Sequence, residues 1–425
     1  MKADQSHSSR TFREHAHAVC AVALITAWAA ALAGCGNAST PPPHPQARPS
    51  VNACSSVAYA GPATYGAIPK RSPSTLALPM EGPLPASLSE AFERDLDWVL
   101  RNTGTPGITA AVGLPGQGLW TATRGVNNDS ARTPLAAPAL FHWASVGKAW
   151  TATLVAQLQE EGRLSLQAPV STWFPHFPNA ANITIDHLLT HRSGIYSYQA
   201  DPAYRATRGY QSPDQAIEIA ARHGNEFCPG QYWSYSNTGY GMLGRIIEAI
   251  EGAPFDEVLR RRLIVPAGLG ATFALAPGQT IAGTATISDD FVPSNPYSAG
   301  NIVATAADMT RWWHALMAGR FVRSDTIDRA LADLYPMVAE PSPDQISSSA
   351  AQAYYGRGLM VYVFENADGE KQEWIGHGGG TPGLKTLVIY DVRSRAIVSV
   401  ALNSDVSPLA VANKLLSTLK AHRQT

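Results

Sequence analysis

Strand-like segments at both ends of the main body, with a mostly helical middle between them, restrict the fold of this chain more than any other feature. The segments rich in apolar residues and bounded by turn residues are 108–114, 119–123, 387–390 and 396–402. Apolar residues recur at helical spacing between them, in residues 145–161, 240–250 and 307–317. Strands from the two ends bury their apolar faces best in a common sheet. We therefore predict one sheet built from both ends, with helices beside it and an inserted helical lobe.

Two more helices are predicted at the borders of this arrangement. From Ser87 onward, apolar residues recur at helical spacing up to a stop signal at Gly104. A last helix is predicted at about residues 408–421. Composition shows no second break after residue 90, so residues 87–425 are predicted to form one catalytic unit of two lobes, with the functional site between them.

The balance of charge argues against one class of partner. The chain has 32 Lys and Arg against 33 Asp and Glu. No basic run could follow a phosphate backbone, so nucleic acid is not expected as a partner. The pattern H-E-x-x-H and other metal-ligand spacings are absent, and neither a metal nor another cofactor is expected. The α/β-hydrolase pattern G-x-S-x-G is absent too.

The N-terminus has the pattern of an export signal. Basic residues precede an apolar run at residues 18–33, which is too short for a comfortable membrane span. The run ends in Leu32-Ala33-Gly34-Cys35, which resembles the lipobox of bacterial lipoproteins. This resemblance implies that residues 1–34 are removed and that Cys35 carries lipid. The alternative is an ordinary signal peptide or short anchor that happens to end in cysteine.

Residues 35–86 are predicted to form a tether. Prolines stand among Ser, Ala and Asn after Cys35, and such a composition cannot bury a core. The lipid would hold the domain at the cell envelope, facing the periplasm or the exterior, with the membrane as a partner.

Two cysteines, Cys54 and Cys228, would remain in the exported domain. An oxidising compartment permits a disulfide between them. Two free thiols are an equally good interpretation, because nothing in the sequence fixes the distance between the two residues.

The first candidate for catalysis is the segment Ser145-Val146-Gly147-Lys148. Residues i and i+3 share one face of a helix, so the hydroxyl of Ser145 and the amine of Lys148 can meet. A serine at a helix start is commonly only an N-cap. However, Lys148 is the only lysine between Lys70 and Lys371, although arginine is frequent in that stretch. Lysine can lose its proton at working pH and arginine cannot, which favours a nucleophile activated by an amine.

A second candidate is Tyr235-Ser236-Asn237, which precedes a predicted helix. A phenol near an ammonium can transfer protons, and an asparagine amide can bind a substrate amide. A third is His377-Gly378-Gly379, just before the strand at residue 387. Glycines let a ligand approach the backbone closely, and histidine offers a titratable group. A loop tyrosine and a glycine-rich turn are the simpler interpretations.

Together these residues stand in the order and approximate spacing of the serine β-lactamase and penicillin-binding protein superfamily. The chain most resembles its branch of class C β-lactamases, DD-carboxypeptidases and esterases, from about Ser87 to Asp405. Further similar blocks are Leu188–His191 with Ser193-Gly194, Tyr235–Gly244, Ala299-Gly300 leading to Thr305 and Asp308, and Gly376–Gly383.

The resemblance implies a β-lactamase/transpeptidase-like α/β (α+β) fold, with an antiparallel sheet flanked by helices and an all-helical lobe. It also implies catalysis through an acyl-enzyme. Ser145 would be the nucleophile, and Lys148 and Tyr235 would transfer protons. Asn237 would orient the substrate amide. The backbone N–H groups of Ser145 and Gly380 would form the oxyanion hole.

One departure from the family pattern concerns substrate binding. The third motif commonly has a threonine where this chain has Gly378, and that hydroxyl helps to hold a substrate carboxylate. Its absence favours esters or amides without the carboxylate. Arg192 or His377 could still supply a positive charge.

The expected function is therefore a serine hydrolase acting on an amide, a β-lactam or an ester, with a small molecule or a peptidoglycan peptide as substrate. The alternatives are a carboxylesterase on the same scaffold and an inactive, envelope-anchored binding protein. A Ser-His-Asp arrangement with His142, His187 or His191 is a further alternative, although in the resembling family the block around His191 is structural.

Overall fold

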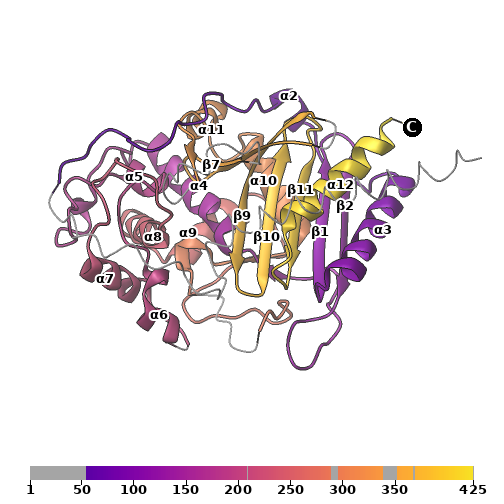
Figure 1. Ribbon diagram of the computed structural model, residues 1–425, viewed down its shortest axis with the longest axis horizontal. Helices are drawn as coiled ribbons and strands as arrows, with labels where there is room; N and C mark the ends of the chain where they lie inside the picture. The colour runs from indigo at the N-terminus through magenta and orange to yellow at the C-terminus, as the bar shows by residue number, and fades with distance from the viewer. Residues whose placement is uncertain (1–53, 208, 289–294, 338–351, 367–368, 425) are drawn as a thin grey trace, which may run out of the picture.

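A single eight-stranded antiparallel sheet forms the centre of the protein (Figure 1). The computed structural model describes residues 54–424 except residue 208 and segments 289–294, 338–351 and 367–368. The strand order is β2-β1-β11-β10-β9-β8-β7-β6. The strands are β1 (Gly107–Leu114), β2 (Gly118–Gly125), β6 (Tyr335–Pro336), β7 (Gln352–Tyr355), β8 (Met360–Glu365), β9 (Lys371–Thr381), β10 (Leu384–Asp391) and β11 (Ile397–Leu402). Because β1 pairs with β11, both ends of the domain build one sheet, which confirms the predicted fold class.

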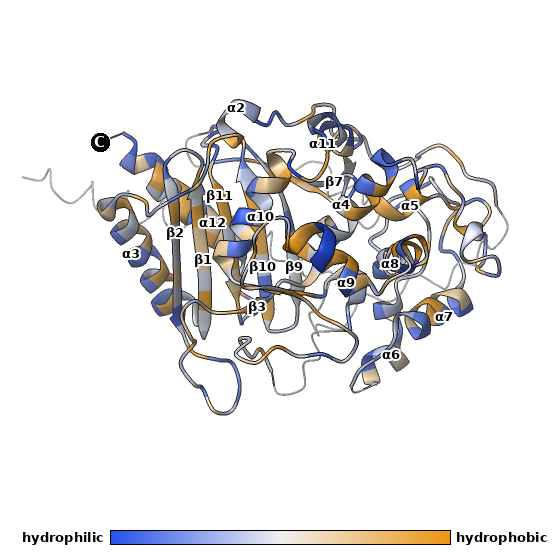
Figure 2. Cartoon of the chain, turned by 180° about the vertical axis from the view of Figure 1, so that it is seen from behind, coloured by the Kyte–Doolittle hydropathy of each residue, from blue (hydrophilic) through white to orange (hydrophobic). Residues whose placement is uncertain are grey.

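Helices cover both faces of this sheet. Helices α3 (Ala86–Thr103) and α12 (Pro408–His422) pack on one face, and α10 (Ala306–Met317) packs on the other (Figures 1 and 2). In β11 the side chain of Ile397 joins the core on one face, whereas that of Val398 joins the core on the other. Successive side chains of a strand point to opposite faces. Both faces are buried, which explains why apolar residues follow one another along residues 396–402, with Ser399 as the one polar residue.

The helical lobe is inserted between β2 and the later strands. Its helices are α4 (Gly147–Glu160), α5 (Ile185–Leu189), α6 (Pro202–Ala206), α7 (Pro213–His223), α8 (Asn237–Glu251) and α9 (Phe255–Leu259). A three-stranded sheet joins this lobe to the main sheet, with β3 (Phe141–His142) and β4 (Thr272–Ala274) on either side of β5 (Ile302–Ala304). The remaining helices are α2 (Pro73–Leu76) and α11 (Ser324–Ala330). Over the described part of the chain, none of these helices has the length and apolarity that a membrane crossing requires.

Residues 54–86 lie along the domain, although we expected a tether as far as residue 86. The guanidinium of Arg71 is buried and donates hydrogen bonds to the carbonyl oxygen of Met317 at 2.6 Å and to Asp328 at 2.7 Å. The backbone N–H of Tyr65 donates to Leu334 at 2.9 Å. These contacts order a segment that its composition had led us to predict as a flexible tether. The predicted signal peptide and Cys35 lie outside the described residues.

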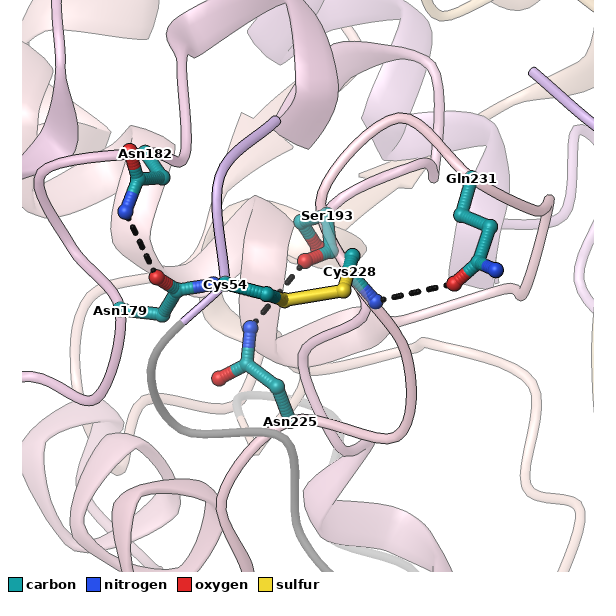
Figure 3. The surroundings of a disulfide bond; sticks show 7 residues. All are labelled: Cys54, Asn179, Asn182, Ser193, Asn225, Cys228 and Gln231. Atoms are coloured by element: carbon teal, nitrogen blue, oxygen red, sulfur yellow. Dashed lines mark hydrogen bonds between the residues drawn. A yellow bond between two sulfur atoms is a disulfide. The ribbon is translucent and has the colours of Figure 1, made fainter. Parts of the chain in front are cut away.

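Cys54 and Cys228 form a disulfide, which decides between the two interpretations left open by the sequence (Figure 3). Two backbone hydrogen bonds continue from this link, because Val57 donates to Pro229 at 2.9 Å and Ala60 donates to Gln231 at 2.8 Å. The N-terminal segment is thereby held on the loop that leads to α8.

The disulfide is expected to stabilise the fold measurably. It joins residues 174 positions apart, and closing so long a loop restricts the unfolded chain strongly. The Cys54→Ser variant should therefore lose about 2–4 kcal/mol of unfolding free energy, measured by denaturant titration without reductant. Reductant should lower the stability of the wild type by a similar amount and leave the variant unchanged. Equal stability of the two proteins in oxidising buffer would contradict the bond.

Candidate active site

Ser145 lies in a short 3-10 turn, Ala144–Val146, directly before α4. The sequence predicted that the helix begins at Ser145, whereas α4 begins two residues later. Ala144 has φ of 47°, a left-handed conformation that alanine rarely adopts. The hydroxyl of Ser145 is thus presented by a strained turn at a helix N-terminus, as is common at functional sites.

Trp143 fixes this turn from beneath. Its side chain is fully buried, and its indole N–H donates to Ala304 at 2.9 Å. Its backbone N–H donates to Ile302 at 2.8 Å, and its carbonyl oxygen accepts from the hydroxyl of Thr386 at 2.9 Å. The small sheet and β10 therefore hold the residues before Ser145 on two sides.

Gly147 allows a close approach of two backbones beside the nucleophile. A Cβ added to Gly147 would lie 2.7 Å from the Cα of Gly300, and a Cβ on Gly300 would lie 2.5 Å from the carbonyl oxygen of Ala144. No side chain fits between these segments, so only glycine is compatible with this packing at either position.

The Gly147→Ala variant is therefore expected to displace the Ser145 turn. Activity should fall by about 100-fold, since a misplacement of about 1 Å has this effect in active sites, and the unfolding free energy should fall by about 1–3 kcal/mol through overpacking. Gly241 in α8 is the matched control, because a Cβ there meets nothing within 4 Å. Gly241→Ala should keep full activity and gain about 0.5–1 kcal/mol. Steady-state kinetics and denaturant titration measure both effects, and equal behaviour of the two variants would contradict the packing argument.

Lys148 reaches Ser145 from one turn along α4. Its side chain is fully buried, and Nζ donates to Ser145 Oγ at 3.2 Å and to the carbonyl oxygen of Ala299 at 2.9 Å. The distance confirms the predicted i, i+3 contact. A buried cation is costly unless polar groups hold it, and these two oxygens hold Nζ beside the hydroxyl.

Tyr235 lies on the other side of Lys148, in the loop before α8. Lys148 Nζ is 4.9 Å from the centre of the Tyr235 ring and 5.5 Å from that of Tyr240. The face of a tyrosine ring attracts a cation at such distances. The structure therefore brings together all three predicted catalytic side chains, Ser145, Lys148 and Tyr235.

Two neutral histidines lie beneath this group. Burial, and secondly the charge of Lys148, lower the pKa of His377 to about 3, and the same causes hold the pKa of His191 well below its usual value. His191 lies 4.2 Å from Tyr235 between ring centres, and its Nδ1 accepts from the backbone N–H of Ser236 at 3.1 Å. Its Nε2 has no hydrogen-bond partner among the described residues. Both rings are therefore uncharged at neutral pH.

Asn237 is the first residue of α8 and is buried. Its side-chain amide donates to the side chain of Gln199, and its backbone N–H donates to Ser197 Oγ at 3.2 Å. The Asn237 amide therefore faces the loop that carries Gln199. Because Gln199 is exposed, it can move away and leave the Asn237 amide free to bind a substrate.

The three glycines Gly378, Gly379 and Gly380 lie in strand β9 and do not form a turn. A Cβ on Gly379 would lie 2.4 Å from the carbonyl oxygen of Trp143 and 3.1 Å from the backbone nitrogen of Ser145. The strand therefore packs directly on the nucleophile turn, and a side chain at this position would separate them.

One edge of β9 is open beside this contact. Strand β8 pairs with β9 only as far as Gly376, and the N–H of Gly378 points to that side, towards Met360 Sδ at 3.4 Å. The N–H of Gly380, two residues further on, points to the same side because backbone groups alternate along a strand. This orientation fits the predicted oxyanion donor.

The interpretation of His377 as a cation that faces the substrate does not fit its surroundings. The side chain is fully buried, and its Nε2 lies 3.1 Å from the hydroxyl of Tyr355. Arg192 does not offer a free charge either, because it is paired with Asp186 at 2.9 Å. Side chains of a strand alternate between its two faces, but the residues on either side of His377 are glycines. The sequence therefore gave no sign of which face of the strand is buried.

Sequence reasoning missed residues that the fold brings to the site. Tyr240 and Tyr355 complete the aromatic surroundings of Lys148 and His191. Lys385 lies opposite Gly380 in the β9–β10 pair. A two-residue turn at residues 382–383 was the signal that could have placed Lys385 there, because hairpin length fixes register.

A cavity of about 270 Å³ lies elsewhere, along α4 on the side of Ala152 and Ala156. Its walls include Leu316, Ile327 and Leu359, and neither Ser145 nor Tyr235 lines it. Within the described ranges, no group of three His, Cys, Asp or Glu side chains is placed to hold a metal ion.

The chain is similar to several known proteins. The family model for beta-lactamase matches residues 88–421. Penicillin-binding protein 4 of Amycolatopsis lactamdurans is 31% identical over 71% of this chain and 82% of its own length. Esterase EstB of Burkholderia gladioli is 30% identical over 43% of this chain and 51% of its own. The crystal structure of D-amino acid amidase from Ochrobactrum anthropi has a TM-score of 0.69 and 26% identity, covering 80% of this chain and all of that one. Two further relatives, both from Bacillus subtilis, match over only 53% and 63% of their own length.

Proposed function

Because the chain belongs to the beta-lactamase family, we propose that it is a serine acyl hydrolase that works through an acyl-enzyme. One observation carries this proposal: Lys148 Nζ lies 3.2 Å from Ser145 Oγ at the start of a buried helix. The hydroxyl is weakly nucleophilic by itself, and a base at this distance can take its proton.

The reaction runs in two steps. Lys148 must first release the proton that it carries in the resting site. Ser145 Oγ then attacks the substrate carbonyl carbon while its own proton passes to the freed amine of Lys148. The backbone N–H groups of Ser145 and Gly380 stabilise the oxyanion, and Tyr235 returns a proton to the leaving group. Water activated by Tyr235 and Lys148 then hydrolyses the ester on Ser145 and restores the hydroxyl. Asn237 orients the substrate after its amide leaves Gln199.

An amide or β-lactam acyl donor is our first choice of substrate. The penicillin-binding protein and the D-amino acid amidase are similar over 71% and 80% of this chain, against 43% for the esterase. Such an amide or β-lactam substrate can be a small molecule or a peptidoglycan peptide. A carboxylesterase is the second candidate, and the observation that favours it is Gly378, which lacks the hydroxyl expected of the third motif.

An inactive binding protein on this scaffold is the third candidate. A protein without activity is free to lose its catalytic side chains. Here the nucleophile, amine and phenol are all present and in contact, which supports an enzyme.

We also propose a location at the cell envelope. The segment Leu32–Cys35 matches a lipobox, and a lipid on Cys35 would hold the domain at the membrane, facing the periplasm or the exterior. The Cys54–Cys228 disulfide supports an oxidising compartment of this kind. Labelling with radioactive palmitate in cells tests the anchor, and loss of the label in Cys35→Ala is the expected result. Equal labelling of the two proteins would overturn it.

The experiment that tests the activity is intact-mass measurement after incubation with benzylpenicillin, together with the rate of drug loss. We expect either a covalent adduct equal to the mass of the drug or its turnover. If neither occurs, hydrolysis of 4-nitrophenyl esters distinguishes an esterase from an inactive protein. If there is no adduct, no loss of the drug and no ester hydrolysis, the proposed function is overturned.

A further inference from the structure

We infer that Lys385 is a specificity-determining residue that binds a carboxylate on the acyl part of the substrate. This inference rests on the proposed function, because it names the class of acyl donor that the Ser145 site accepts. It reverses the expectation from Gly378, since a cation from the neighbouring strand takes over where the third motif lacks its hydroxyl.

The position of Lys385 follows from the register of one hairpin. Strands β9 and β10 pair with Thr381 opposite Leu384, which places Lys385 opposite Gly380. A Cβ added to Gly380 would lie 3.1 Å from Lys385 Cδ and 3.5 Å from Nζ. The ammonium therefore lies close above the backbone of Gly380, whose N–H is our oxyanion donor.

Strand β9 contributes no side chain at Gly378 or Gly380, although Tyr362 covers the strand at Gly378. Residues 378 and 380 project to the same face because strand side chains alternate, and both are glycines. A Cβ on Gly378 would already lie 2.9 Å from the hydroxyl of Tyr362. No side chain from these two positions separates the Lys385 ammonium from an acyl group bound along the strand.

Lys385 is partly accessible and carries a weakly held counter-ion. Its side chain is 16% exposed, and Nζ lies 2.9 Å from Asp405 Oδ1. The Asp405 side chain is 53% exposed, so water can solvate it again when a substrate carboxylate replaces it. Because the Asp405 partner of this ion pair is exposed to water, we expect the exchange to cost little.

The other cations considered for this role are committed elsewhere. His377 is buried and uncharged, and Arg192 is paired with Asp186. Lys148 holds the nucleophile. Of the candidates in the described part of the site, Lys385 combines a charge, partial exposure and a position beside the oxyanion donor.

The test compares two esters of equal chain length, 4-nitrophenyl hydrogen glutarate and 4-nitrophenyl valerate. They differ only by a carboxylate in place of a methyl group. For the whole protein, we expect Lys385→Gln to raise KM for the glutarate ester about 10- to 100-fold. KM for valerate should change less than twofold, and kcat for both esters should stay within threefold. Lys385→Arg, which keeps the charge, should retain most of the wild-type preference for the glutarate ester over the valerate ester.

Control variants separate recognition from a structural role. Lys420→Gln removes a lysine that is paired with Glu370 elsewhere, and it should change neither ester. Asp405→Asn removes the competing carboxylate and should lower KM for the glutarate ester only. Equal rises in KM for both esters in Lys385→Gln would show that Lys385 only supports the hairpin, and unchanged KM values for both esters would show that it does not contact the acyl group. Either result overturns the inference.

Failure of the proposed function has a different signature. If the wild type hydrolyses valerate in a Ser145-dependent way but rejects glutarate, the enzyme stands and the role of Lys385 is wrong. If neither ester is hydrolysed and benzylpenicillin gives neither an adduct nor drug loss, the proposed function fails, and the inference fails with it.

Discussion

The Ser145→Ala variant is expected to lose all measurable hydrolysis, a fall on the order of 10⁴- to 10⁶-fold in kcat, as found when a nucleophile is removed from other serine hydrolases. The reason is that no acyl-enzyme can form without Oγ. The fold should be nearly unchanged, because Ser145 is only partly buried and, among the residues that the structure describes, its hydroxyl makes one hydrogen bond, to Lys148. Such a bond contributes about 1 kcal/mol.

Ser234→Ala is the matched control for this variant. Ser234 lies next to Tyr235, is also partly buried, and its hydroxyl contacts Glu226 at 3.4 Å. It should keep wild-type rates. Initial rates and thermal unfolding of the three proteins measure the effect. Residual turnover by Ser145→Ala well above the uncatalysed rate would show that another residue is the nucleophile.

The Lys148→Arg variant is expected to lose at least about 10³-fold in kcat/KM. Arginine keeps the positive charge, but it cannot give up its proton at working pH and so cannot accept one from Ser145. The Lys148 side chain is fully buried, so the larger guanidinium should also cost about 1–3 kcal/mol of stability through overpacking. Circular dichroism and denaturant titration therefore accompany the kinetics.

A second variant separates loss of the base from loss of packing. Lys148→Ala removes the amine and leaves space behind, so an added small amine such as ethylamine should restore part of the activity. The Lys148→Arg variant has no such space, and ethylamine should not rescue it. Lys70→Arg, at an exposed lysine, is the control for the substitution itself. Wild-type activity in Lys148→Arg would contradict proton transfer by Lys148.

Local spacing explains why the centre of the site could be predicted from the sequence. Residues 145 and 148 meet because any helical turn brings i and i+3 together, and this holds although Ser145 itself lies in a 3-10 turn. Likewise, a single sheet was predicted because strand pairs at both ends enclose a helical middle, and the pairing of β1 with β11 joins them. Both predictions depend on geometry within a few residues or on burial of a whole face.

The predictions that failed concerned contacts between distant segments. His377 lies beside Tyr355 in β7. No local pattern in the sequence indicates that the His377 ring is buried and neutral. Residues 54–86 were predicted as a tether from their prolines, but the disulfide, Arg71 and the buried side chains of Leu76 and Leu84 order them on the domain. Lys385 was overlooked because its place depends on the register of a hairpin. The position of Lys385 opposite Gly380 therefore became visible only in three dimensions.

The disulfide also determines how the domain bears a mechanical load. A pull on the chain upstream of Cys54 passes through the covalent bond into Cys228, and it bypasses residues 55–86. Those residues lie inside the closed loop, so tension cannot peel them from the domain one hydrogen bond at a time. After reduction, the contacts of this segment would carry the force one after another, first the Val57–Pro229 hydrogen bond and later those of Arg71. In the oxidised protein the force enters seven residues before Tyr235, so the load falls on the loop that carries Tyr235.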